Sequence, residues 1–232
     1  MSPKMRHRRF DLVMFDLDGT LIDSAPDIHA AINELLATDG LGPVTLEQAR
    51  TFIGNGVRKL IERAYAACGH PLDLADMDAH VARMLPIYKR HLVNLTVPIP
   101  GAFEALDELA GQGRKLALVT NKPTPAIAEI LAHFGIAERF VAVIGAEAGY
   151  APKPAPDMLD AAMKTAGVTR DRSIMVGDGA ADIGGARAAG VTVIGLAGGY
   201  GPEVATGANV SIDAMSKLVA TIEVLEVSKI DA

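Results

Sequence analysis

Short apolar runs alternate with stretches of helical periodicity through the second half of this chain, and this alternation limits the folds that it can adopt. The helical stretches cover residues 102–111, 125–134, 157–166 and 180–189. The apolar runs that follow them cover residues 115–119, 140–144, 173–176 and 191–196. Strands that alternate with helices form a parallel sheet with helices on both faces, joined by right-handed crossovers. We therefore expect an α/β fold with a Rossmann-like, doubly wound parallel sheet.

The same pattern begins earlier, with an apolar run at residues 10–17 that we expect to form a buried strand. Ser24 and Pro26 then have the features of an N-cap and a first-turn residue, and the helix that they start is expected to end near Ala37. A final helix, with an apolar periodicity that suits core packing, is expected at residues 215–227.

The residues between these two regions contain helical patterns and no run that is typical of a strand. One pattern starts at Thr45, with Gln48 placed for a capping box. Two more cover residues 57–68 and 74–93, and Pro86 is expected to disturb the second of them. These stretches have their own apolar faces, which favours a helical block that packs on itself.

Length and composition agree with a two-part globular protein. The chain has 232 residues, of which 50% are hydrophobic, and this is enough for one domain that carries a smaller insertion. The expected division is an α-helical subdomain at residues 23–94, inserted into an α/β core of residues 1–22 and 95–232. The formal net charge of −6 provides no positive field that would attract nucleic acid or a membrane surface.

The single cysteine, Cys68, excludes an intramolecular disulfide and a cysteine-based zinc site. No segment is apolar over the length that a bilayer requires. The basic N-terminal residues are not followed by the apolar stretch of a signal peptide, and we expect them to form a solvated tail; they are Lys4, Arg6, Arg8 and Arg9. We therefore expect a cytoplasmic protein that is a monomer or a homodimer.

Polar residues follow the apolar runs at the points where ligands bind in sheets of this kind, beyond the carboxyl ends of the strands. These polar segments are residues 16–20, 120–122 and 147–153, and residues 177–178 with Asp182. Because each segment follows a predicted strand, we expect all of them to meet at one edge of the sheet. This recurrence is the strongest functional signal that the residues themselves provide.

Three aspartates in these segments are typical of an oxygen-ligand metal site. Asp16 and Asp18 are two residues apart at a strand end, a spacing that points both carboxylates the same way. Two such carboxylates repel each other unless a cation lies between them, and Asp178 at another strand end can complete the site. Mg²⁺ suits such a set of carboxylates, together with water and phosphate oxygens. One aspartate alone would more often cap a helix or a turn, so the combination carries the prediction.

The remaining polar residues suit a phosphate group. The hydroxyls of Thr20 and Thr120 and the backbone amides near Gly19 and Asn121 are donors that can hold phosphate oxygens. Lys153 lies between two prolines that stiffen its backbone, and its ammonium can neutralise a transferring phosphoryl group. Each of these residues alone is equally compatible with a solvated turn or a surface loop.

The segment Asp16-Leu17-Asp18-Gly19-Thr20, behind an apolar strand, resembles the first motif of the haloacid dehalogenase superfamily. Thr120 is similar to its second motif, Lys153 to its third, and Gly177-Asp178 with Asp182 to its fourth. The four motifs occur in order and extend over almost the whole chain. The helical block between the first two resembles the α-helical cap subdomain that closes over the active site in this family.

This resemblance implies a magnesium-dependent phosphotransfer reaction. Asp16 would attack phosphorus to form an aspartyl-phosphate, and Asp18 would protonate the leaving alcohol and later activate water. Thr120 would bind the phosphoryl oxygens, and Lys153 would pair with Asp16 and the phosphate. The implied Mg²⁺ ligands are Asp16, the backbone carbonyl of Asp18 and Asp178, with Asp182 in support through water or Lys153.

Residues 51–57, Thr-Phe-Ile-Gly-Asn-Gly-Val, resemble the cap loop of phosphoglycolate phosphatases. The resemblance implies that Gly54, Asn55 and Gly56 bind a small phosphorylated metabolite, with phosphoglycolate as the first candidate. The plain structural alternative is that the two glycines form a turn between helices. Two departures from the family are Gly179, where the fourth motif often has Ser, and residues 198–201, which match the subfamily's glycine-tyrosine run in part.

Four other functions are weighed against this one. A phosphosugar mutase of the β-phosphoglucomutase type shares the motifs and the cap. A dehalogenase is disfavoured by Asp18, and a phosphonatase would need a cap lysine, for which Lys59 is the nearest candidate. A phospho-accepting, receiver-like signalling module also places Asp, Thr and Lys at strand ends. Receivers are shorter, however, and lack both the helical insertion and the fourth motif.

Overall fold

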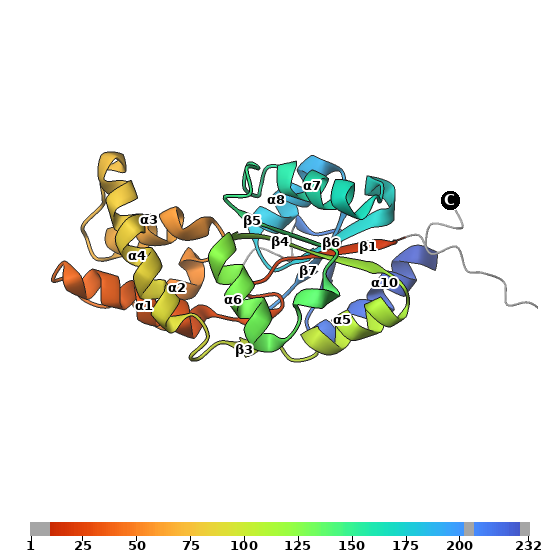
Figure 1. Cartoon of the computed structure of the whole chain (residues 1–232), viewed down its shortest axis with the longest axis horizontal. Coiled ribbons are helices and arrows are strands. Elements are labelled where there is room, and N and C mark those ends of the chain that lie inside the picture. The colour runs from red at the N-terminus through yellow and green to blue at the C-terminus, as the bar shows by residue number, and fades with distance from the viewer. Residues whose placement is uncertain (1–9, 202–206, 228–232) are drawn as a thin grey trace, which may run out of the picture.

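The structure is a computed structural model that describes residues 10–201 and 207–227 (Figure 1). Its centre is a six-stranded sheet with the strand order β5-β4-β1-β6-β7-β8, in which every pair is parallel. The strands are β1 (Leu12–Phe15), β4 (Lys115–Pro123), β5 (Ala142–Ala146), β6 (Ser173–Gly177), β7 (Thr192–Leu196) and β8 (Val210–Ile212). The predicted Rossmann-like sheet is thus confirmed.

The strand order changes direction beside β1, and this creates the place for a site. The chain passes from β1 to β4 and β5 on one side, and then crosses to β6, β7 and β8 on the other. In open α/β sheets a crevice forms at such a switch point, outside the carboxyl ends of the strands. The ends of β1, β4 and β6 are therefore the edge to inspect.

Helices cover both faces of the sheet because each strand is apolar on both sides. In β1, Val13 and Phe15 belong to one hydrophobic cluster, and Leu12 and Met14 belong to a second one. In Figure 1 one face carries α7 and α8, and the opposite face carries α5, α6 and α10. The bounds of these helices are α5 (Ala102–Gly111), α6 (Thr124–Phe134), α7 (Asp157–Ala166), α8 (Ala180–Ala189) and α10 (Leu218–Val227).

The cap helices lie together at one end of the molecule (Figure 1). They are α1 (Ala25–Thr38), α2 (Leu46–Phe52), α3 (Gly56–Ala67) and α4 (Met77–His91). The predicted capping box of α2 is present, since Thr45 Oγ1 accepts from the Gln48 amide at 3.1 Å and the Gln48 side chain accepts from the Thr45 amide at 2.8 Å.

The prediction that Pro86 disturbs its helix is wrong, because α4 continues through this residue without a break. The predicted long helix over 74–93 instead begins as a short 3-10 turn, Leu74–Asp76, and then continues as α4. A proline removes one intrahelical donor and crowds the preceding turn, but neighbouring packing can support the helix. Tyr88 and Ile87 on this helix are buried, and they hold it against the other cap helices.

A short antiparallel pair lies where the chain leaves the sheet for the cap and returns. It joins β2 (Ile22–Asp23) to β3 (Val97–Pro98), with Ile22 opposite Pro98 and Asp23 opposite Val97. The domain limits near residues 22 and 95 stay predictions. The two strands of this pair lie close to those limits in the sequence. Neither β2 nor β3 was expected, since two residues carry no periodicity.

Several expectations concern the remaining regions. The basic residues Lys4, Arg6, Arg8 and Arg9 lie outside the described residues. Cys68 is partly buried, and its sulfur lies 3.2 Å from the carbonyl oxygen of Gly42. Among the helices of residues 10–201 and 207–227, none combines the length and the apolar character that crossing a bilayer requires.

Candidate active site

The carboxyl ends of three neighbouring strands bring the predicted acids together. Asp16 directly follows β1, Asp178 directly follows β6, and Thr120 lies near the end of β4. The register pairs Phe15 with both Leu118 and Val176, so these positions are level across the sheet. The ends of strands β1, β4 and β6 thereby place groups more than 100 residues apart in one crevice, as the sequence predicts.

Lys153 is fully engaged by the acids beside it. Its Nζ donates to Asp16 Oδ1 at 2.9 Å, to Asp182 Oδ1 at 2.6 Å and to the carbonyl oxygen of Val119 at 2.6 Å. Burial alone would lower the pKa of this lysine, but Asp16 and Asp182 outweigh burial and hold the pKa above its ordinary value. Lys153 therefore stays charged, and each of its three ammonium hydrogens has an acceptor.

Three buried carboxylates form the acidic side of the site. Oxygen atoms of Asp16, Asp178 and Asp182 lie within 4.8 Å of one another. Burial, followed by the charges of neighbouring acids, raises the pKa of Asp16 to about 6 and that of Asp178 to about 8. When ionised, the three carboxylates and the Lys153 ammonium sum to two negative charges, which one divalent cation would balance. This buried oxygen-donor set fits Mg²⁺.

Asp178 is held from two sides by groups that leave little space around it. Its Oδ1 accepts from the Thr20 hydroxyl at 2.8 Å, and its Oδ2 accepts from the Tyr200 amide at 2.6 Å. A side chain at Gly19, where φ is +84°, would meet the Asp178 carboxylate at 2.3 Å, and one at Gly199 would meet Asp178 Cβ at the same distance. The backbone must approach the acid this closely, and only glycine permits it.

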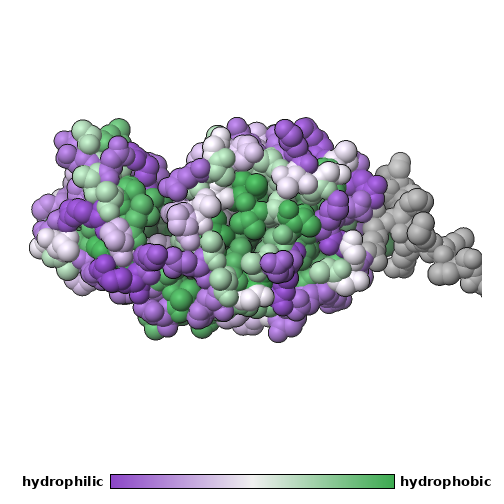
Figure 2. Space-filling model, in the orientation of Figure 1, coloured by the Kyte–Doolittle hydropathy of each residue, from purple (hydrophilic) through white to green (hydrophobic). Residues whose placement is uncertain are grey.

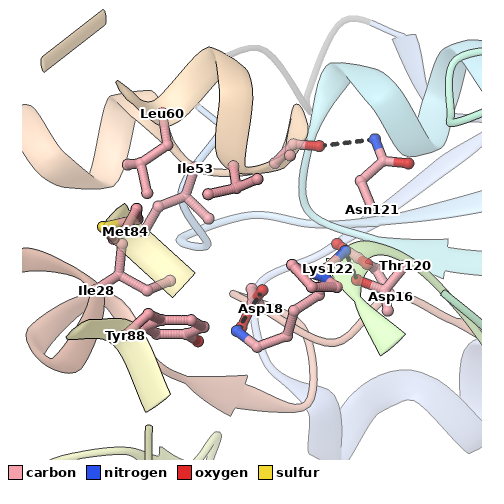
Figure 3. Close-up of a pocket in the computed structure, with 14 residues that line it drawn as sticks. Asp16, Asp18, Ile28, Ile53, Leu60, Met84, Tyr88, Thr120, Asn121 and Lys122 are labelled. Atoms are coloured by element: carbon pink, nitrogen blue, oxygen red, sulfur yellow. Dashed lines mark hydrogen bonds and ion pairs between the residues drawn. The ribbon is translucent and has the colours of Figure 1, made fainter. Parts of the chain in front are cut away.

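The predicted phosphate-binding threonines occupy different positions. Thr120 lines the pocket drawn in Figure 3, which is called the main pocket below because it contains both Asp16 and Asp18 and the cap residues that face them. Thr20 is completely buried, and its hydroxyl is directed at Asp178. The geometry therefore suits a contact of Thr120 with the phosphoryl group, whereas Thr20 orients a carboxylate.

Gly179 stands where the family motif often has a serine. Its amide donates to Asp182 Oδ2 at 2.9 Å, so this carboxylate receives bonds from the Gly179 backbone and from Lys153. Asp182 is thus fixed at the start of α8, although no hydroxyl is present at position 179.

Asp18 shares the pocket with Asp16, but a different lysine holds it (Figure 3). Lys122 Nζ lies 2.7 Å from one carboxylate oxygen of Asp18 and 2.9 Å from the other. The Ser24 hydroxyl also donates to Asp18 Oδ1, at 2.5 Å. Lys122 lies in the predicted polar segment 120–122 but was assigned no role, and Ser24 was not predicted as a site residue. Ser24 was expected as a helix N-cap, and its side chain makes no capping bond.

Asn121 connects the cap loop to the loop that carries Lys153. Its Nδ2 donates to the carbonyl of Gly54 at 3.0 Å and to that of Lys153 at 2.9 Å, while its Oδ1 accepts from the Lys153 amide at 2.9 Å. Gly54 and Gly56 line the main pocket. Asn55 lines an adjoining opening instead, where its side chain accepts from Arg63 at 2.8 Å.

The walls of the main pocket are polar on the sheet side and apolar on the cap side (Figure 3). The space-filling view shows the outline of the molecule indented between the cap helices and the sheet part (Figure 2). The apolar cap wall consists of Ile28, Ile53, Val57, Leu60 and Met84. A ligand in this pocket would thus meet charged groups at one end and hydrocarbon around the other.

Tyr200 connects the carboxylate cluster to the β2–β3 pair. Its amide binds Asp178, and its hydroxyl donates to Asp23 Oδ1 at 2.6 Å. Arg50 from the cap binds the other oxygen of Asp23 at 2.9 Å and lies over the Tyr200 ring at 5.2 Å. The partial match at residues 198–201 therefore includes a tyrosine with a defined structural position.

Comparison with known proteins agrees with this arrangement. Residues 13–196 match the family model described as haloacid dehalogenase-like hydrolase. The match covers most of the chain and includes all four motifs. The chain therefore belongs to the haloacid dehalogenase-like hydrolase family, and it is an enzyme of that hydrolase class.

Within that family, the chain is similar to proteins named phosphoglycolate phosphatase. One from Caulobacter vibrioides is 39% identical over 191 residues, which is 82% of this chain and 81% of the relative. One from Cereibacter sphaeroides is 42% identical over 188 residues, with 81% and 85% covered. A solved structure described as a predicted phosphoglycolate phosphatase from Haemophilus somnus 129PT superposes with a TM-score of 0.84 at 31% identity, covering 91% of this chain and 97% of that one.

Proposed function

We propose that this protein is a phosphoglycolate phosphatase that works with Mg²⁺ through an aspartyl-phosphate on Asp16. One observation carries the proposal: Asp16 lies at a strand end within a buried cluster of three carboxylates and one lysine. Such a cluster holds a nucleophile, a cation and a place for a divalent metal in one crevice. Relatives that share about 40% of the sequence supply the name of the substrate.

In the first step, Asp16 attacks phosphorus and the alcohol leaves from the opposite side. Thr120 lines the pocket beside Asp16 and donates to the phosphoryl oxygens, and the Lys153 ammonium, which is bonded to Asp16, offsets the negative charge on the transferring group. Mg²⁺, held by Asp16, Asp178 and the backbone carbonyl of Asp18, would neutralise charge on the transferring group. Asp182 acts through Lys153, which it fixes at 2.6 Å.

Asp18 handles the proton in both steps. It gives a proton to the leaving alcohol, and it then removes one from the water that attacks the phosphorylated Asp16. Ser24 and Lys122 hold its carboxylate in the pocket, beside the apolar cap wall. A closed cap keeps bulk water away from this group, which suits the proton transfers.

The character of the pocket favours a small ester over a sugar phosphate. The cap wall is built from aliphatic side chains such as Ile53, Leu60 and Met84, which offer no partner to sugar hydroxyls. A buried hydroxyl without a partner costs about 1–3 kcal/mol of binding free energy. A hexose phosphate has several hydroxyls and would incur this cost several times. This argument disfavours the mutase alternative.

Phosphate release from a panel of esters tests the proposal. With Mg²⁺ present, we expect phosphoglycolate to be hydrolysed with the highest kcat/KM, and EDTA to abolish the reaction. Glucose 1-phosphate should give neither phosphate nor an isomerised product at a comparable rate. An enzyme that hydrolyses none of the esters, or that isomerises the hexose phosphate, would contradict the proposal.

A further inference from the structure

A second cation in the pocket fixes Asp18 in the chemistry described above and is given no contact with the substrate there. Lys122 Nζ lies at the junction of core and cap, between Asp18 and the ring of Tyr88 (Figure 3). Among the lining residues of the main pocket in the described chain, Lys122 is the only cation. Lys153, by contrast, lies behind Asp16 with its three hydrogens already directed.

Lys122 keeps its charge and still has capacity for another acceptor. Burial lowers its pKa, but Asp18 and then Tyr88 more than compensate and hold the pKa above its ordinary value. The two oxygens of Asp18 occupy one side of the ammonium. The remaining side faces the Tyr88 ring, whose centroid lies 5.0 Å from Nζ. A lysine has three hydrogens to donate, so an anion in the pocket can bind without displacing Asp18.

Tyr88 offers a second polar group at this place. Its hydroxyl is buried and has no hydrogen-bond partner among the described residues. Such a group is costly in a native structure unless water or a ligand satisfies it. Burial raises the pKa of Tyr88 to about 12, so the hydroxyl remains a neutral donor at working pH.

We propose that Lys122 and Tyr88 form the subsite for the substrate's second anionic group, a carboxylate two bonds beyond the ester oxygen. The proposal rests on the function proposed above. Asp18 contacts the ester oxygen in that function, and Lys122 is bonded to Asp18. A carboxylate attached directly to the ester methylene therefore falls beside Lys122 and Tyr88.

The surroundings select a carboxylate over a second phosphate. Lys122 supplies a single positive charge that Asp18 already shares, and the rest of the wall is apolar, so a singly charged carboxylate costs less to bury here than a doubly charged phosphate. Because β4 supplies the lysine and α4 supplies the tyrosine, the subsite is complete only when the cap rests on the core. Lys122 is thus a specificity-determining residue. In a variant that lacks the Lys122 ammonium, Asp18 keeps its hydrogen bond from Ser24.

Kinetics on two matched esters test the subsite. Phosphoglycolate and its carboxamide analogue have the same shape but differ by one charge. In the wild type we expect kcat/KM to be about 10- to 100-fold higher for the carboxylate, the range for a charge-assisted hydrogen bond in a buried site. In Lys122→Met this ratio should fall to near one, whatever the absolute rates are.

Two further variants make the result specific. Tyr88→Phe, which removes only the hydroxyl, should lower the ratio by a smaller factor, and it keeps the proposal testable if Lys122→Met does not fold. The matched control is Lys59→Met, because Lys59 is an exposed cap lysine paired with Glu62; its ratio should equal that of the wild type.

The outcomes separate this inference from the proposed function. An unchanged ratio in folded Lys122→Met and in Tyr88→Phe overturns the carboxylate subsite and leaves the phosphatase intact. A wild-type ratio near one does the same. A wild type that hydrolyses neither ester overturns both.

Discussion

At the residue scale, two aspartates two positions apart are separated in function by the lysines that bind them. Asp16 is bonded to Lys153, and Asp18 is bonded to Lys122. The first belongs to a buried cluster of three carboxylates, and the second faces the apolar cap wall. This difference in surroundings supports assigning nucleophile and proton-transfer roles to otherwise identical side chains.

The proton-transfer role that we propose for Asp18 predicts a dependence on the leaving group. In Asp18→Asn the first turnover of phosphoglycolate should slow by about 10²- to 10⁴-fold, the usual contribution of general acid catalysis. p-Nitrophenyl phosphate needs no proton on its leaving group. It should therefore still give a rapid burst of one nitrophenolate per enzyme, followed by slow turnover.

Rapid-quench measurement of the first turnover checks this prediction. Asp213→Asn is the control, since Asp213 is exposed and paired with Lys217, and it should behave as the wild type. Equal slowing of both esters in the first turnover of Asp18→Asn would show that Asp18 does not protonate the leaving group.

The residues of the site were predictable to different degrees. Asp16 and Asp178 follow strong apolar runs, and a strand end fixes where the next side chain lies. Lys122 also follows such a run, but a lysine after a strand is usually solvated. Its partner Tyr88 lies on a helix of another part of the fold, so no local pattern connects the two. Thr20 was expected at the phosphate, and only the structure shows its hydroxyl directed at Asp178.

At the scale of elements, the long periodic segments were predicted well and the short ones were not. The helices at 102–111, 157–166 and 180–189 have the observed bounds. The strand expected at 115–119 extends to Pro123, because the polar residues Thr120 to Lys122 continue it past the apolar run. β2, β3 and β8 have two or three residues each, too few for any periodicity to appear.

The Asn121 side chain connects the cap loop to the loop that carries Lys153, and its removal gives the prediction at this scale. Asn121 binds the Gly54 carbonyl and both backbone groups of Lys153. In Asn121→Ala these two loops lose their common support. A displacement of about 1 Å near the reacting atoms can cost about 100-fold in rate, so we expect kcat/KM to fall about 10- to 100-fold.

Steady-state kinetics at a temperature well below the unfolding midpoint of the variant test this effect. Asn94→Ala is the matched control, because the Asn94 side chain donates only to the Arg90 carbonyl on the same helical segment and is exposed. Activity of Asn121→Ala within twofold of the wild type would show that the loops keep their positions without it.

At the scale of the whole molecule, an acidic protein presents an acidic site to an anionic substrate. The chain has a formal charge of −6, and its buried cluster adds local negative charge where the phosphoryl group must enter. Mg²⁺ binding is therefore expected to precede productive substrate binding, because the cluster otherwise repels the ester. The apolar cap residues of the pocket lie opposite Asp16 and Asp18.

The raised pKa values predict how metal and pH act together on stability. Burial raises the pKa of Asp16 to about 6 and of Asp178 to about 8, from an ordinary value of 3.8. Between pH 3.8 and about 8, the metal-free folded state holds protons on these two carboxyls that the unfolded chain has already released. Its stability therefore decreases as the pH rises through this window.

Mg²⁺ requires the ionised carboxylates, so protons compete with it. The rise in Tm at a fixed Mg²⁺ concentration should accordingly be larger near pH 8.5 than near pH 5.5. Asp178→Asn should lose most of this rise. Thermal melts at both pH values, with and without Mg²⁺, measure it, and an equal or larger rise at the lower pH would contradict the metal site.

The covalent transfer to Asp16 is tested most directly by chemical trapping during turnover. Enzyme, Mg²⁺ and phosphoglycolate are mixed, quenched and reduced with borohydride, which converts an aspartyl-phosphate to homoserine. Peptide mass spectrometry should then find homoserine at position 16 in the wild type, and none in Asp16→Asn or without Mg²⁺. Homoserine at another aspartate, or an unmodified Asp16 while glycolate release runs ahead of phosphate release, would contradict the account.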